Sequence, residues 1–163
     1  MKKNIAIYAG TFDPVTNGHL DIINRASKMF DQLYVTIFLN PEKSGTFTVE
    51  ERKRLLEEVT KDYDNVIIDA SEELSVEYAK SVGSKILVRG IRATMDFEYE
   101  LQLAFSNQFL DPDIEMVFLM TRPSQSFISS SSVKEIVSHG RSVKGLVPEF
   151  VEEALQEKLY KNK

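Results

Sequence analysis

The sequence predicts an α/β domain: a five-stranded parallel sheet flanked by helices, with a further helix at the C-terminus. Two observations carry this prediction. Short apolar, β-branched runs recur along the chain, each bounded by polar or turn residues, as is typical of buried strands. Helical patterns separate these runs, and alternation of strand and helix indicates a parallel sheet. The predicted strands are residues 5–8, 33–39, 66–68, 86–88 and 116–120.

Spacing and capping signals predict the helices. After the first strand, Ile22, Ala26, Met29 and Phe30 share one helical face. The segment Thr48-Val49-Glu50-Glu51 has the pattern of a capping box and opens a helix predicted to run through Glu58. Weaker patterns predict helices at residues 74–82 and 133–138, and a final helix follows Pro148 with apolar positions at Val151, Ala154, Leu155 and Leu159.

One helical stripe is aromatic. Phe97, Leu101, Phe105 and Phe109 recur at helical spacing, and such aromatic side chains usually pack, so we expect them in the core or in a subunit contact. Together the elements predict an open, Rossmann-like sheet. Ligands of such sheets bind at the carboxyl ends of the strands, near the point where strand order reverses. The segments to examine therefore follow Tyr8, Leu39, Val88 and Met120.

Composition narrows the class of protein. With 163 residues, 42% of them hydrophobic and 28% charged, we expect one domain spanning residues 1–163. No apolar run approaches the roughly 18 residues of a membrane span, and the apolar run after Lys2-Lys3 is too short for a signal peptide, so we expect a cytoplasmic protein. The absence of cysteine excludes disulfides, thiolate catalysis and cysteine metal sites. A net charge of −5 argues against a broad nucleic-acid surface, although a local basic cleft for a phosphorylated ligand remains possible.

The segment 10–19, which follows the first strand, predicts an anion site. If a helix opens near Thr16 or Asn17, His19 lies in its first turn, where unpaired N–H groups and the macrodipole favour an anion. Thr11 offers a hydroxyl and an N–H group, and the two glycines of the segment permit close approach of a phosphate. The structural alternative is a tight turn with a surface histidine.

Two later segments supply cations at the same predicted edge of the sheet. Lys43 lies in the loop 40–45, where it could hold a phosphate, although a solvated lysine is the ordinary alternative. Arg89 and Arg92 flank Gly90 after the fourth strand, and guanidinium groups can grip phosphate oxygens. The alternative for both arginines is a set of salt bridges to Asp96, Glu98 or Glu100.

A serine-rich segment, residues 124–134, follows the fifth strand and turns into a helix. Serine side chains at a helix start can cap the helix and bind anions. A flexible linker or a simple N-cap is the alternative, but Phe127 and Ile128 favour a packed segment. We therefore interpret this segment as a second helix terminus that faces phosphate.

These segments together resemble the nucleotidyltransferases of the HIGH type, through Thr16-Asn17-Gly18-His19 and Ile128-Ser129-Ser130-Ser131. Within that superfamily the chain most resembles the bacterial phosphopantetheine adenylyltransferases. Further matching segments are residues 10–14, 89–92, 96–100 and 126–131, so the resemblance covers essentially the whole chain. Ala9, where the family often has proline, and Gln125, at a variable position, are departures that remove no phosphate contact.

The resemblance implies a function. The family transfers the adenylyl group of ATP to 4′-phosphopantetheine, giving 3′-dephospho-coenzyme A and pyrophosphate in the penultimate step of coenzyme A biosynthesis. Attack is direct and in line, without a covalent enzyme intermediate. The resemblance also implies a homohexamer with feedback inhibition by coenzyme A. Mg²⁺ is expected as a cofactor carried mainly by phosphate oxygens and water, so no metal-ligating residue is predicted.

Roles for individual residues also follow from the resemblance. His19 is expected to be catalytic, stabilising the transition state at the ATP phosphates. The expected substrate-binding residues are Thr11, Lys43, Leu74, Ser75 and Arg89. The expected ATP-binding residues are Thr11, Phe12, His19, Gly90, Ile91, Arg92, Glu100, Gln125, Ser126, Phe127, Ile128, Ser129, Ser130 and Ser131.

Two other functions stay open at the level of sequence. A related nucleotidyltransferase that uses nicotinamide mononucleotide, or a sugar or alcohol phosphate, would share the phosphate-binding residues and differ in its acceptor pocket. A non-catalytic sensor of ATP or coenzyme A would keep the fold without turnover, although the presence of His19, Lys43, Arg89 and Arg92 argues against it.

Overall fold

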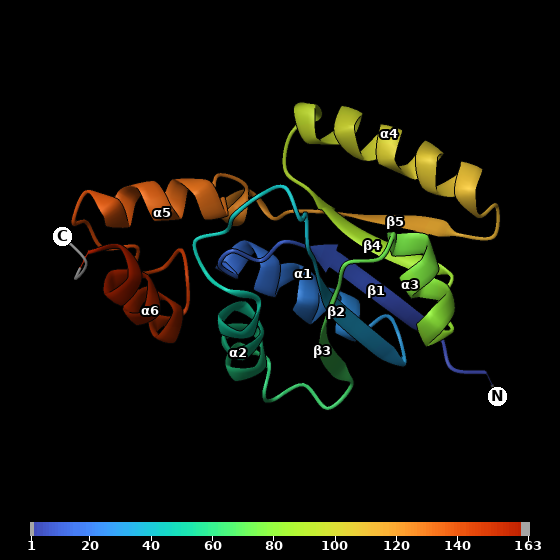
Figure 1. The fold of residues 1–163 in the computed structure, drawn as a ribbon, viewed down its shortest axis with the longest axis horizontal. Helices are drawn as coiled ribbons and strands as arrows, with labels where there is room; N and C mark the ends of the chain where they lie inside the picture. Colours follow the sequence, from blue (N-terminus) through green and yellow to red (C-terminus); the bar gives the residue numbers. More distant parts are fainter. Residues whose placement is uncertain (1, 161–163) are drawn as a thin grey trace.

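The strands form one parallel sheet in a computed structural model that describes residues 2–160, except for the side chains of residues 94 and 95 (Figure 1). All the predicted strands are confirmed: β1 (Ile5–Gly10), β2 (Gln32–Phe38), β3 (Val66–Ser71), β4 (Ile86–Ile91) and β5 (Glu115–Met120). Their order in the sheet is β3-β2-β1-β4-β5. The chain builds outward from β1 to β3 and then returns to the other side of β1, so strand order reverses between β1 and β4.

Helices connect and follow these strands at α1 (Asn17–Ser27), α2 (Val49–Val59), α3 (Ser75–Val82), α4 (Thr94–Leu110), α5 (Ser130–Ser138) and α6 (Glu149–Leu159). Capping boxes at Thr16, Thr48 and Ser129 fix the starts of α1, α2 and α5. The cap at Ser129 explains why α5 begins earlier than its apolar pattern predicted. Met29 was wrongly placed on the apolar face of the first helix: α1 ends at Ser27, where the chain turns toward β2, and Met29 is 51% exposed.

Helices cover both faces of the sheet. On one face α1 and α2 pack over β1 and β2, and α5 and α6 continue the same core. On the other face α3 packs over β1 and β4 through Val76, Tyr78 and Ala79. In Figure 1, α4 lies alongside β4 and β5, while α5 and α6 lie together at the other end of the molecule. Within residues 2–160, no helix is both long and apolar enough to cross a membrane.

The face that α4 turns toward the sheet is not the aromatic one. Phe97, Phe105 and Phe109 are 45%, 62% and 88% exposed, so their expected place in the core is wrong. Glu100 and Asn107, each 4% exposed, are buried instead. Because α4 carries apolar side chains around much of its circumference, periodicity alone could not identify the covered face. The alternative, a subunit contact, stays a prediction.

Candidate active site

A cavity of about 630 Å³ opens where strand order reverses, at the carboxyl ends of β1 and β4. This volume is within the usual range for small-molecule sites. Most of the predicted site residues line it, namely Thr11, His19, Leu74, Ser75, Arg89, Gly90, Arg92, Glu100, Ile128, Ser129, Ser130 and Ser131. The first turns of α1 and α5 therefore share one cavity with the end of β4 and one face of α4.

Other predicted residues do not line this cavity: Phe12, Lys43, Ile91, Gln125, Ser126 and Phe127. Phe12 and Ile91 are 1% and 6% exposed, so only their backbone is left to meet a ligand. Lys43 is an exposed side chain on the loop between β2 and α2. The side chain of Phe127 is 66% exposed.

His19 is held by the cap of its own helix. The N–H group of Thr16 donates to His19 Nδ1 at 3.0 Å, and the N–H group of His19 lies 3.4 Å from Thr16 Oγ1. Because Nδ1 accepts a backbone hydrogen bond, the neutral ring carries its proton on Nε2. The sequence prediction that His19 lies in the first turn of a helix is confirmed.

Phe12 supports the same ring. The two rings meet edge to face with a centroid separation of 5.0 Å, and the backbone of Phe12 has a φ of 46°, which is uncommon for a residue other than glycine. A Cβ on Gly10 would lie 3.0 Å from the ring of Phe12. Gly10 therefore makes room for Phe12, a reason different from the close phosphate approach that the sequence suggested.

The electrostatic environment keeps His19 neutral. Burial in the cavity wall, and then the positive charges of Arg92 and Arg89, lower the pKa of His19 to about 4. At neutral pH the imidazole is therefore a hydrogen-bond donor through Nε2, without a net charge.

Both arginines are paired with carboxylates. Arg89 donates to Glu100 from Nε at 2.9 Å and from Nη2 at 2.7 Å, and its Nη1 donates to the carbonyl of Ala9 at 2.7 Å. Arg92 contacts Asp96 at 3.2 Å and the carbonyl of Ile128 at 3.0 Å. The pair formed by Arg92 is the more exposed of the two, so Arg92 is the cation with more freedom to turn toward a phosphate. Glu100 holds Arg89, which is the salt-bridge alternative that the sequence offered, and its expected contact with ATP stays a prediction.

The serines at the start of α5 divide their tasks. Ser129 caps the helix and bonds to Ser132, and the hydroxyl of Ser130 donates to the carbonyl of Pro14 at 2.8 Å. Ser131 is exposed and lines the cavity. The groups of this segment suited to an anion are therefore the hydroxyl of Ser131 and the N–H groups of the first turn of α5.

At the far end of the cavity the sequence predicted Glu100, Leu74 and Ser75, but it missed the other residues that α4 contributes. Asp96, Tyr99, Glu100, Leu103 and Asn107 line it from a single face of α4. Their spacing is helical, so the periodicity counted from Glu100 would have found them. Opposite this face, Leu74 and Ser75 line the cavity from the start of α3, and the hydroxyl of Ser75 lies 3.3 Å from Asn107 Oδ1.

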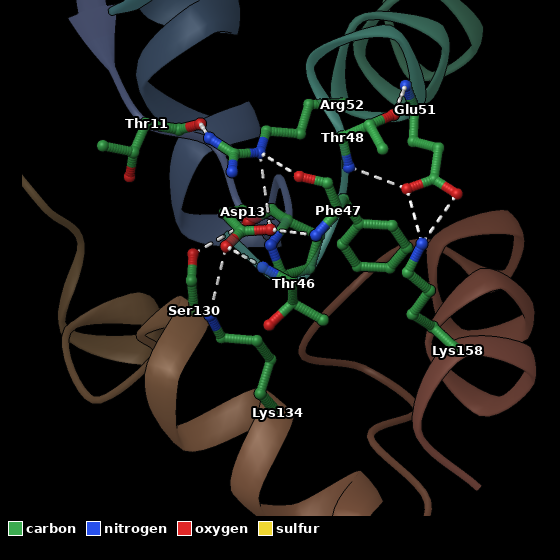
Figure 2. Close-up of polar contacts among 11 residues, drawn as sticks. Thr11, Asp13, Thr46, Phe47, Thr48, Glu51, Arg52, Ser130, Lys134 and Lys158 are labelled. Atoms are coloured by element: carbon green, nitrogen blue, oxygen red, sulfur yellow. Dashed lines mark hydrogen bonds and ion pairs between the residues drawn. The ribbon is translucent and has the colours of Figure 1, made fainter. Parts of the chain in front are cut away.

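Asp13 and Arg52, which sequence reasoning also passed over, connect the walls of the site (Figure 2). Both are 8% exposed. Arg52 lies three and four positions before the buried Leu55 and Leu56, and a charged residue at a core-facing position was the available signal. In the part of the chain that the structure describes, no group of three or more histidine or acidic side chains is arranged to hold a metal ion.

The chain is similar to known proteins over most of its length. The cytidylyltransferase-like family model matches residues 7–136. The chain is 52% identical over 157 residues to the phosphopantetheine adenylyltransferase of Carboxydothermus hydrogenoformans, covering 96% of this chain and 97% of that protein. It is 51% identical over 144 residues to the phosphopantetheine adenylyltransferase of Clostridium novyi, covering 88% and 89%.

A solved structure supports the fold. The crystal structure of a Vibrio parahaemolyticus protein, provisionally assigned as a nicotinate-nucleotide adenylyltransferase, superposes with a TM-score of 0.75 over 99% of this chain and 98% of that chain. Sequence identity is 18%, so this likeness concerns the fold alone.

The protonation of His19 can be measured directly. The chain has two histidines, so His139→Gln leaves His19 as the only one to observe by NMR. We expect its titration near pH 4, well below the ordinary value of 6.5. As the pH falls, the imidazole is protonated in the unfolded chain before it is protonated in the folded one. The free energy of unfolding should therefore decrease as the pH falls from 6.5 to about 4. A titration midpoint above pH 6 would contradict the neutral donor.

Proposed function

Because the chain belongs to the phosphopantetheine adenylyltransferases of the cytidylyltransferase-like family, we propose that it transfers the adenylyl group of ATP to 4′-phosphopantetheine. The products are 3′-dephospho-coenzyme A and pyrophosphate. The observation that carries the proposal is the convergence of two helix N-termini, of α1 with His19 and of α5 with Ser131, on one cavity beside Arg92. N–H groups and cations arranged in this way suit a polyphosphate.

The chemistry needs little from the protein beyond position and charge. The attacking phosphate of 4′-phosphopantetheine is already an anion, so no general base is required for attack on the α-phosphorus of ATP. Catalysis then depends on orientation and on stabilising the charge that develops in the transition state. We propose that His19 donates from Nε2 to a phosphate oxygen, and that Thr11 and Lys43 orient the attacking phosphate.

The two substrates occupy different ends of the cavity in this proposal. ATP lies against α1, α5 and residues 90–92, and the serine-rich segment 125–131 contacts it chiefly through backbone groups and Ser131. The pantetheine arm extends along Leu74 and Ser75 toward Asn107. Arg89, fixed by Glu100, faces the point where the two substrates meet.

Mg²⁺ fits this arrangement as a cofactor held largely by phosphate. In proteins, Mg²⁺ commonly binds through water molecules, substrate phosphates and at most one or two protein ligands. Here the phosphates of ATP would supply most of the oxygen ligands. When bound it neutralises phosphate charge. The chain's own cations then act at the remaining phosphate oxygens.

A pyrophosphate-release assay tests the function. Purified protein with ATP and Mg²⁺ should release pyrophosphate with 4′-phosphopantetheine and not with nicotinamide mononucleotide or simple sugar and alcohol phosphates. Turnover with one of those other acceptors instead would assign a related nucleotidyltransferase. ATP binding without pyrophosphate release under any acceptor would assign a nucleotide sensor.

His19→Ala should lower kcat by about 10²- to 10³-fold, because a transition-state contact of this kind is worth that much. Substrate binding and folding should be largely retained. His139→Ala is the matched control, since His139 lies exposed at the end of α5 and should leave the rate near that of the wild type. Near-normal turnover in His19→Ala would remove the proposed role.

The exposed aromatic face of α4 supports the expected homohexamer, since large exposed apolar patches commonly mark interfaces. Sedimentation should give a mass six times the 18.6 kDa of the chain. Phe109→Asp, at the 88% exposed end of the stripe, should shift the assembly toward smaller species. Met29→Asp, on an exposed side chain outside α4, serves as control. A wild-type monomer would reject the hexamer.

The proposal also includes feedback inhibition by coenzyme A and a cytoplasmic location for the protein. Coenzyme A carries both a pantetheine arm and an adenosine moiety, so it could occupy both ends of the same cavity and inhibit by competition. A place in coenzyme A synthesis is consistent with the cytoplasmic location expected from the sequence.

A further inference from the structure

The carboxylate of Asp13 accepts hydrogen bonds from backbone groups that lie far away in the sequence. Oδ2 accepts from the N–H group of Thr46 at 2.9 Å, and Oδ1 accepts from the N–H group of Phe47 at 2.9 Å (Figure 2). Lys134, on α5, lies 3.3 Å from Oδ2. One side chain in the β1–α1 loop therefore holds the β2–α2 loop and contacts α5.

Arg52 joins the same two loops from the other side. Its Nε donates to the carbonyl of Phe47 at 2.9 Å, and its Nη1 lies 3.3 Å from the carbonyl of Thr11. Its Nε is also 3.5 Å from Asp13 Oδ1. A Cβ on Gly45 would lie 1.6 Å from a guanidinium nitrogen of Arg52, so the loop passes directly against this group.

The loop held in this way carries Lys43. Its N-terminal end continues from β2, where the N–H group of Leu39 donates to Ser71, and the N–H group of Lys43 donates to Asn40 at 3.1 Å. On the C-terminal side, only residues 44 and 45 separate Lys43 from Thr46, where the Asp13 contacts begin. The position of the Lys43 backbone thus depends on contacts made at both ends of the loop.

We propose that Asp13 is a positioning residue for the acceptor phosphate, and that with Arg52 it fixes the placement of Lys43 relative to Thr11. This inference rests on the proposed function, in which Thr11 and Lys43 orient the attacking phosphate. Asp13 touches neither substrate in this role and acts through the backbone of the β2–α2 loop. The constraint matters because a shift of about 1 Å in a reacting group can lower a rate about 10²-fold.

Asp13→Asn tests the inference with little change in shape. An amide can accept from only one of the two N–H groups and turns its own donor toward the other, and it loses the attraction of Arg52 and Lys134. With saturating ATP, we expect kcat/KM for 4′-phosphopantetheine to fall about 10²-fold. A value within twofold of the wild type would overturn the proposal.

A double-mutant cycle with Lys43→Ala separates positioning from a general structural effect. If Asp13 acts by placing Lys43, Asp13→Asn should cost much less in the Lys43→Ala background, and the two losses should fall well short of additive. Additive losses would overturn the proposal. A Lys43→Ala enzyme with wild-type kcat/KM would overturn it as well, because Lys43 would then have no contribution for Asp13 to position.

Arg52→Lys provides a second variant, to be used in the same cycle if Asp13→Asn does not fold. This variant keeps the positive charge beside Asp13 and loses the paired contacts to Thr11 and Phe47. The decrease in kcat/KM that it causes should also be non-additive with that of Lys43→Ala. Additivity there counts equally against the proposal.

Glu51→Gln is the matched control. Glu51 precedes Arg52, pairs with Lys158 at 2.8 Å and accepts from the N–H group of Thr48 at 2.8 Å, so it too is a carboxylate bound to a lysine and a backbone donor. Within residues 2–160, the carboxylate of Glu51 accepts hydrogen bonds from Thr48 and Lys158, and none from Thr46 or Phe47. The kcat/KM of Glu51→Gln should stay within twofold of the wild type. A decrease in kcat/KM equal to that of Asp13→Asn would overturn the specific role of Asp13.

Failure of this inference is distinguishable from failure of the function. The function fails if the wild-type protein releases no pyrophosphate with 4′-phosphopantetheine. The inference fails only through the variants, measured in an enzyme whose wild-type activity is established in the same assay.

Discussion

The buried carboxylate of Asp13 is the constraint on which the walls of the site depend. Burial raises the pKa of this carboxyl group. The N–H groups of Phe47 and Thr46 and the charges of Arg52 and Lys134 together lower it by more, so the net shift is downward. The group is therefore ionised at neutral pH and needs all of these partners. Because the partners come from the β2–α2 loop, α2 and α5, satisfying one charge brings together segments that the sheet alone would leave separate.

The cavity itself combines fixed donors with balanced charges. The cap of α1 orients the ring of His19, and burial together with the positive charges of Arg92 and Arg89 keeps that ring neutral. Carboxylates of Glu100 and Asp96 in turn hold the arginines. A polyphosphate entering such a site meets oriented N–H groups at two helix termini without having to reorganise a set of solvated side chains. Preorganisation of this kind is the usual source of transition-state stabilisation by electrostatics.

The parts of this molecule that sequence could predict are those encoded locally. The strand runs, the cap at Thr48, and the place of His19 in the first turn of α1 all depend on neighbouring residues, and the structure has each of them. The sequence left open whether the aromatic stripe of α4 lies in the core or in a subunit contact, because aromatic spacing does not tell a core from an exposed surface. The role of Asp13 could not be predicted, because its partners lie 33, 34 and 121 positions away in the chain.

The same distinction divides the cavity. In the proposed function, the end of the cavity that binds phosphate is formed by strand order and by two helix N-termini. These features follow from the fold, and a protein of 18% identity shares that fold. Its other end is formed by side chains on one face of α4 and at the start of α3, among them Leu103, Asn107 and Leu74. Helix packing, and not a local motif, brings these side chains together. In the proposed function, selectivity for the acceptor depends on the packing of α3 against α4, and adenylyl transfer depends on the edge of the sheet.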